Sequence, residues 1–172
     1  ADRIYRLFGD GQSNTGWAWP APMSGAIQND FPEVEYPGRM QPNLDIQLRR
    51  ADQTQNYYER GYLYVDQPFF DAMQLPLISG NAKTALTEPQ TMVITQSLAD
   101  KYYPGQNPVG QLMYLNNDKE HPYRITAVMA DIPVTSHLNP FNFFITLSRK
   151  GFWEGEQNDW SAYNYIVYVK LK

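Results

Sequence analysis

The two histidines are the side chains in this sequence best suited to acid–base catalysis or to metal binding. His121 precedes Pro122 in a polar stretch, and His137 follows Ser136 in a segment rich in turn residues. Neither has a second His or a Cys at the spacing of a zinc site. Asp131, Ser136 and His137 have the composition of a hydrolase triad, but the G-x-S-x-G elbow that positions such a serine is absent. We therefore expect two loop histidines and no enzyme activity.

Carboxylates occur in two pairs, Glu33 with Glu35 and Glu154 with Glu156, and alternation along a strand would place each pair on one face. A glycosidase or a metal site could use such a pair. Nothing nearby suggests the apolar pocket that raises the pKa of a carboxylic acid, so surface charge is the expectation. The run N-N-D-K-E at 116–120 does not fit the EF-hand template and reads as a hairpin tip. We predict no catalytic, cofactor-binding or metal-binding residue.

Composition excludes further classes of function. The chain has no cysteine, which removes thiolate nucleophiles, Cys-containing zinc sites and iron–sulfur clusters. Its formal net charge is -4, so the basic surface that binds nucleic acid is not expected. Neither a dinucleotide fingerprint nor a P-loop occurs.

Aromatic residues make up 15% of the chain and are the remaining candidates for binding. Tyr and Trp combine a large apolar surface with a polar edge, which suits contact with a partner, a sugar or a membrane surface. Packing of a sheet with exposed hydroxyl groups is the alternative. Trp17 and Trp19 lie in a polar, Gly-rich loop, and we predict that they contact a partner.

The elements that must position these residues are mostly strands. Asp66 and Thr95 are predicted N-caps, Gly80 is predicted to need a positive φ, and Pro37 and Pro42 are predicted to separate two strands. Short helices are expected near 23–31, 68–73 and 96–103. Strands are expected at 3–8, 34–39, 44–49, 57–65, 75–78, 91–94, 111–115, 123–129, 141–147 and 165–171.

These patterns predict an α+β fold with a largely antiparallel or mixed sheet. No run approaches the roughly 18 consecutive apolar residues of a membrane-spanning helix, so the given residues should form a soluble domain. The chain begins without Met, directly on a strand-like run, which suggests a piece of a longer protein.

Several short motifs follow one another in a fixed order between residues 64 and 146. They are Y-V-D-Q-P-F-F at 64–70 with L-P-L-I-S-G at 75–80, V-I-T at 93–95 with L-A at 98–99 and Y-Y-P at 102–104, N-P-V-G-Q at 107–111, and Y-R-I-T-A-V at 123–128 with D-I-P at 131–133 and S-H at 136–137. In this order they resemble the extracytoplasmic domain of MacB/FtsX-type ABC transporter permeases. Residues 2–6 and 27–39 are similar to the start of that domain, so the resemblance covers nearly the whole chain. Ala127 and Thr95 depart from it, where the family usually has Gly and Ser.

The resemblance marks a set of positions as structural signatures of the family. These are Asp66, Phe69, Phe70, Gly80, Leu98, Ala99, Asn107, Pro108, Gly110, Asp131 and Pro133.

What the resemblance implies is a single periplasmic core domain, residues 1–172, of a permease in the bacterial inner membrane. A ferredoxin-like β-α-β lobe from 1–50 and 140–172, lacking its final helix and strand, would hold an inserted β-rich lobe from 51–139. The implied partners are the protein's own transmembrane helices, a cytoplasmic ATPase subunit, a second permease copy, and a periplasmic partner or exported substrate. The domain would transmit ATP-driven motion to that substrate or partner without catalysis. The alternative is a free-standing periplasmic ligand-binding or sensor domain that uses an aromatic surface.

Overall fold

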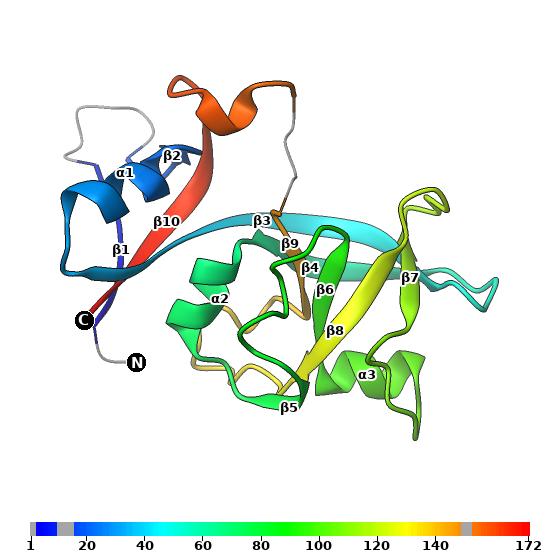
Figure 1. Ribbon diagram of the computed structural model, residues 1–172. Coiled ribbons are helices and arrows are strands. Elements are labelled where there is room, and N and C mark those ends of the chain that lie inside the picture. Colours follow the sequence, from blue (N-terminus) through cyan, green and yellow to red (C-terminus); the bar gives the residue numbers. More distant parts are fainter. Residues whose placement is uncertain (1–2, 10–15, 149–152) are drawn as a thin grey trace.

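The computed structural model describes residues 3–9, 16–148 and 153–172. Ten strands of this described part join in one mixed sheet with mostly antiparallel neighbours, which confirms the predicted α+β class (Figure 1). The helices are α1 (Met23–Asp30), α2 (Gln67–Met73), α3 (Gln96–Tyr102) and the 3-10 turn η1 (Glu156–Asn158). The strands are β1 (Ile4–Arg6), β2 (Trp19–Pro20), β3 (Val34–Arg50), β4 (Tyr57–Val65), β5 (Leu77–Gly80), β6 (Thr91–Thr95), β7 (Leu112–Leu115), β8 (Tyr123–Met129), β9 (Phe143–Thr146) and β10 (Tyr163–Leu171). No helix in the described ranges is long and apolar enough to cross a membrane.

The two ends of the chain build the expected β-α-β unit. Strand β10 lies between β1 and β3 and is antiparallel to both, so β1 and β3 run parallel with α1 as the connection between them. This arrangement is the split β-α-β motif of ferredoxin-like folds. Helix α1 contacts β3 and ends at Asp30, so Phe31, the last residue of the predicted helix, is its C-cap.

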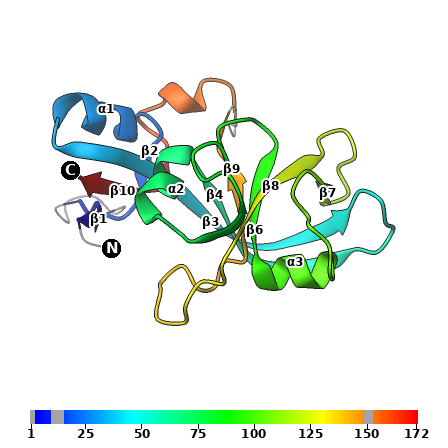
Figure 2. The same ribbon diagram turned by 60° about the horizontal axis from the view of Figure 1, so that its bottom comes forward.

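Strand β3 corrects the prediction of two strands separated by prolines. It runs without interruption for 17 residues, from the α1 side of the molecule to the α3 side (Figure 2). Pro37 lies in the part that pairs with β10 only, and Pro42 in the part that pairs with β4 only. Each proline therefore lies where the strand has one open edge, and a missing N–H is tolerated there.

The far half of β3 belongs to a closed ring of strands. The pairings run from β3 to β4, β9, β6, β8 and β7, and β7 returns to β3. These six strands therefore form a small barrel, whose closure depends on the pairing of Leu48–Arg50 with Met113–Leu115. The predicted hairpin of β7 and β8 is confirmed and supplies the last step of the ring.

Residue alternation gives the barrel strands two buried faces. One face points into the barrel and supplies Tyr62, Met92, Ile94, Ile125 and Phe143 to an interior cluster. The other face packs below α2 and against β10, in a second cluster that includes Leu63, Val65, Val93, Phe144 and Tyr168. Strands β6 and β9 are consequently buried along their whole length, as continuous apolar runs predict.

Helix α2 sits directly on β3 because Gly38 has no side chain. A Cβ at Gly38 would lie 2.2 Å from Cα of Phe69, which is far closer than any van der Waals contact. The predicted cap of this helix is confirmed, since Asp66 accepts a hydrogen bond of 3.0 Å from the backbone N–H of Phe69. Thr95 caps α3 in the same way, at 3.3 Å from the N–H of Leu98.

Candidate functional site

The two ends of the described chain are held side by side. The backbone N–H of Leu171 donates to the carbonyl of Arg3 at 3.0 Å, and the Arg3 guanidinium donates to the carbonyl of Lys172. The N–H of Lys172 donates to the carbonyl of Glu33 at 3.0 Å, just before β3 begins. Both chain ends therefore adjoin the start of the longest strand (Figure 1).

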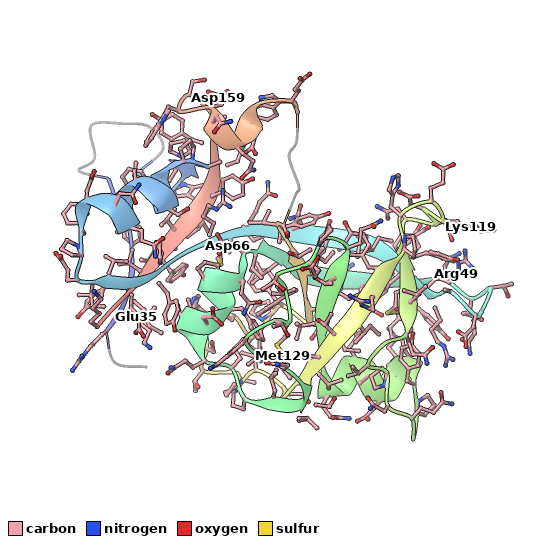
Figure 3. All side chains as sticks on the ribbon, viewed as in Figure 1. Glu35, Arg49, Asp66, Lys119, Met129 and Asp159 are labelled. Carbon is pink, nitrogen blue, oxygen red and sulfur yellow. The ribbon has the colours of Figure 1, made fainter. Side chains whose placement is uncertain are left out.

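Arg39 and Asp66 form an ion pair where β3 changes partner from β10 to β4. The Nε of Arg39 donates to Oδ2 of Asp66 at 2.9 Å, and its backbone N–H donates to Oδ1 at 2.9 Å. The two side chains are only 15% and 13% exposed, so solvent screens the pair weakly. Figure 3 shows Asp66 where α2 begins, next to β3.

The Asp66 carboxylate is subject to two opposing effects. Burial raises its pKa above the ordinary value, because the charged form loses hydration. The charge of Arg39 and the hydrogen bonds from Arg39 and Phe69 act in the other direction. One carboxylate thus joins a strand, a helix N-terminus and a buried cation.

The same arginine reaches the segment that precedes β10. Its Nη1 donates to Oε1 of Gln157 at 2.9 Å, and its guanidinium lies 5.2 Å from the centre of the Tyr165 ring. The Gln157 amide donates to the Tyr165 hydroxyl at 3.2 Å, and that hydroxyl donates to the buried Glu156 at 3.2 Å. We name Arg39, Asp66, Glu156, Gln157 and Tyr165 the junction network.

The Tyr165 hydroxyl stays protonated at physiological pH and donates a hydrogen bond to Glu156. Burial, with a contribution from the Glu156 carboxylate, raises the pKa of Tyr165 to about 12. The network joins β3, α2, η1 and β10 through groups held by hydrogen bonds, and truncation of a member would leave buried polar atoms without partners.

A pocket of about 620 Å³ adjoins the junction network. Its walls include Gln67, Thr87, Ser148 and Trp153 besides network residues. Within the described ranges, no group of three or more His, Asp or Glu side chains is placed to hold a metal ion.

Asp131, Ser136 and His137 do not form a catalytic triad. The Asp131 carboxylate accepts from the backbone N–H of Ser97 at 2.9 Å, and the Ser136 hydroxyl accepts from the N–H of Leu138 at 3.2 Å. His137 instead bonds to the Tyr168 hydroxyl at 3.0 Å through Nε2. His121 pairs with Asp118 at 2.9 Å. Both histidines lie in loops, as predicted.

The signature positions hold turns, caps and packing contacts. Asp66, Phe69 and Phe70 form the start of α2, and Leu98 and Ala99 point from α3 into the barrel cluster. Gly80 has the predicted positive φ, 95°, and a Cβ there would lie 2.4 Å from the Thr126 carbonyl oxygen.

The remaining signatures lie in two turns. The Asn107 side chain accepts from the N–H of Val109 at 3.1 Å, Pro108 is buried, and Gly110 has a φ of 92°. The Pro133 carbonyl accepts from the N–H of Ser136 at 2.9 Å.

The two predicted contact tryptophans differ in their surroundings. Trp17 is 52% exposed. Trp19 lies in β2, opposite Tyr165 of β10, and its indole N–H donates to the Leu7 carbonyl at 3.3 Å. Partner contact stays a prediction for both, and Trp17 is the more accessible side chain.

The sequence reasoning missed Arg39, Gln157 and Tyr165 as members of a site. It was also wrong about Glu156, which was expected to be a surface charge but is 1% exposed and accepts a hydrogen bond from Tyr165. The one local signal was an arginine within an otherwise β-forming run, directly after Gly38 and one residue before the strand changes partner.

Comparison with solved structures places this fold among permease domains. A domain described as part of a permease of Porphyromonas gingivalis is 24% identical with a TM-score of 0.82, and the match covers 99% of this chain and 76% of that one. The periplasmic region of MacB from Actinobacillus actinomycetemcomitans is 14% identical with a TM-score of 0.62, over 98% and 73% of the two chains. The extracellular domain of the transporter YknZ from Gram-positive bacteria is 10% identical with a TM-score of 0.59, over 98% and 82%. A search of proteins with curated descriptions gave no match.

The model of the MacB-like periplasmic core domain matches residues 2–172. This family consists of periplasmic domains of ABC transporter permeases, which have transmembrane helices and an ATPase partner and are generally not catalytic. The chain therefore belongs to the MacB-like periplasmic core domain family and lies on the periplasmic side of the inner membrane.

Proposed function

We propose that this domain transmits ATP-driven motion of the permease's membrane helices to a substrate or partner in the envelope, without catalysis of its own. The observation that carries the proposal is the path of β3. This strand starts beside both chain ends and continues for 17 residues into the barrel. At about 3.3 Å per residue it spans roughly 55 Å. A displacement of β1 and β10 would therefore act on one end of a continuous strand.

The junction network supports the proposal because it lies where β3 passes from one set of partners to the other. Arg39 joins α2 through Asp66 and joins η1 through Gln157. A paired, buried charge has a narrow range of favourable geometries, so it should resist relative sliding of the elements that it joins.

The proposal includes the organisation of the chain. The β-α-β lobe would comprise 1–50 and 140–172, and the β-rich lobe 51–139, with β3 and β9 connecting the two through their pairing with β4. The working unit would be a permease dimer with a cytoplasmic ATPase. A periplasmic partner or an exported substrate would be contacted by the far side of the barrel or by Trp17. Membership of a permease family favours this function over a free-standing sensor.

The experiment measures distances between two copies of the full-length permease with its ATPase. Spin labels are attached to a cysteine that replaces Glu33, near the chain ends, or Lys119, at the exposed hairpin tip. We expect both label pairs to change their distance when ATP is added. In Arg39→Ala the change at Glu33 should persist and the change at Lys119 should be lost or broadened.

The matched control is Arg60→Ala, because Arg60 forms an exposed pair with Asp45 at 3.9 Å. This variant should keep both distance changes. If ATP moves the Glu33 labels but leaves the Lys119 labels in place in the unmodified protein, the domain does not transmit motion.

A further inference from the structure

The six-stranded barrel is closed at one end and hollow at the other. Helix α3 covers the closed end, where Leu98, Ala99 and Tyr102 join the interior cluster. At the opposite end, a hollow of about 510 Å³ lies between the hairpin loop 116–122 and the segment Pro89–Gln90. Figure 1 shows this hairpin loop on the side of the barrel away from α3. We call the hollow the barrel mouth; such positions and volumes are typical of small-ligand sites.

Aromatic rings line the barrel mouth. Tyr62 and Tyr64 come from alternate positions of β4, and Tyr123 starts β8. Tyr62 stacks on Phe143 at 5.3 Å between ring centres and meets Tyr64 edge-on at 5.6 Å. Ile46 and Leu115 complete the apolar part of the lining. The rings are therefore positioned by packing inside the barrel, and a ligand would not have to order them.

Polar groups surround these rings. Gln90, Asn116, Asp118 and His121 line the mouth together with the tyrosine hydroxyls. Burial raises the pKa values of Tyr62, Tyr64 and Tyr123, so all three are neutral phenols. Tyr62 and Tyr64 share a hydrogen bond with each other, which leaves the Tyr123 hydroxyl as the phenol best placed to bond a ligand. The mouth therefore offers both donors and acceptors above an apolar floor.

The Asp118 carboxylate is already occupied by its own loop. It accepts from the backbone N–H groups of Glu120 at 3.0 Å and His121 at 3.2 Å, and it pairs with the His121 ring at 2.9 Å. No Lys or Arg is among the described residues that line the mouth. An anion would lack a counter-charge here, and a cation would have to compete with His121 for the carboxylate.

The backbone of the rim has an unusual conformation at Gln90, with a φ of 55°. Asn116 and Asn117 also have positive φ, but they form the tight turn of a hairpin, where asparagine is common. Gln90 lies in the turn that follows Pro89 and leads into β6, and its carbonyl accepts from the N–H of Arg124 at 2.8 Å. A positive φ directly after a proline suits a type II turn, and this turn holds Gln90 at the rim of the mouth.

We propose that the barrel mouth binds a small neutral saccharide. A sugar ring presents an apolar C–H face, which the tyrosines can contact, and hydroxyl groups that can bond to the Gln90 amide, the Asn116 side-chain NH2 and the Tyr123 hydroxyl. The Asn116 side-chain oxygen already accepts from the N–H of Gln47 at 3.1 Å. A purely apolar ligand would instead leave the polar rim without partners, at a cost in binding free energy. The volume fits a mono- or disaccharide.

The test uses the 172-residue chain and two-dimensional amide NMR with glucose, N-acetylglucosamine and their β1,4-linked disaccharides as probes. We expect saturable shift changes at residues 62–64, 89–90 and 115–123 with at least one probe. Tyr123→Ala should weaken the affinity about tenfold or more, as loss of a central aromatic contact does.

The matched control is Tyr58→Ala on the same strand as Tyr62, because Tyr58 is 74% exposed and lies outside the mouth. It should bind the sugar as the unmodified chain does. The proposal fails if no probe shifts the mouth residues, if Tyr123→Ala binds unchanged while folded, or if tetramethylammonium, tested as a cation, binds and the sugars do not.

Discussion

Asp66 joins the start of α2 to strand β3. Its two oxygens accept three hydrogen bonds, from the Arg39 backbone, the Arg39 side chain and the first turn of α2. Replacement by alanine leaves the Arg39 guanidinium without its counter-charge in a site that solvent hardly reaches.

Asp66→Ala should therefore lower the free energy of unfolding by about 3 kcal/mol, through loss of a poorly exposed ion pair and a helix cap. Asp45→Ala, which removes an exposed pair at 3.9 Å, should change it by less than about 0.5 kcal/mol. Urea denaturation of the isolated chain measures both. Equal effects would contradict the role assigned to Asp66.

His137 should make stability depend on pH. Burial and the charge of Arg6 lower its pKa below the ordinary 6.5, and its Nε2 bonds to Tyr168. Between the lowered pKa and 6.5 the unfolded chain binds more protons than the folded chain, so stability rises with pH in this window and is lost as the pH falls through it.

Histidine NMR titration should give His137 a pKa below 6.5. The free energy of unfolding should rise with pH below 6.5, and His137→Gln should reduce that slope. A measured pKa for His137 at or above 6.5 would refute the burial argument.

At the scale of elements, the seating of α2 on β3 depends on Gly38. Gly38→Ala would place a methyl group 2.2 Å from the Phe69 backbone, so the helix must shift away from the strand. We expect a loss of about 3 kcal/mol or more in the free energy of unfolding, as overpacking of a core produces.

Gly25→Ala is the matched control for Gly38→Ala. It lies in α1 with nothing within 4 Å of an added Cβ, so Gly25→Ala should stabilise the chain by about 0.5–1 kcal/mol. Thermal denaturation should show shifts of opposite sign for the two variants. The same sign for both would mean that α2 is not held against β3 as described.

Local signals in the sequence predicted the elements that depend on neighbours in the chain. Asp66 and Thr95 are N-caps, and the side chain of each accepts a hydrogen bond from the backbone N–H three residues later in the chain. The prolines of β3 led to a wrong prediction, because a proline is typical both of a break between two strands and of a strand with one unpaired edge. Which edge of a strand is open is decided by β10 and β4, and no residue near Pro37 or Pro42 encodes it.

At the scale of the whole molecule, the barrel and the junction network were beyond sequence reasoning for the same reason. Leu48 pairs with Leu115, and Arg39 bonds to Gln157, across long stretches of chain. The β-formers predict that these segments are strands but do not specify their partners. The family resemblance, in contrast, depended on turns and caps, which are local.

Burial on both faces should make the centre of the sheet the most protected part of the molecule. Amides of β6 and β9 should exchange with deuterium most slowly, near the rate set by global unfolding, because the strands are buried throughout and paired on both edges. The single amide of β2, that of Trp19, should exchange fastest among the strands, because β2 has two residues and Pro20 has no N–H. Exchange of β6 as fast as β2 would be inconsistent with a closed barrel.

The ladder between β1 and β10 sets how the domain responds to a pulling force. It is antiparallel, with Ile4 opposite Lys170 and Arg6 opposite Tyr168, so a force that separates the two chain ends acts across the strands. Hydrogen bonds of such a ladder lie in the direction of the force and would break one after another, which requires little tension. A force along β3 would instead load all its bonds to β4 in shear. The domain should thus yield by peeling at its ends while its barrel stays intact.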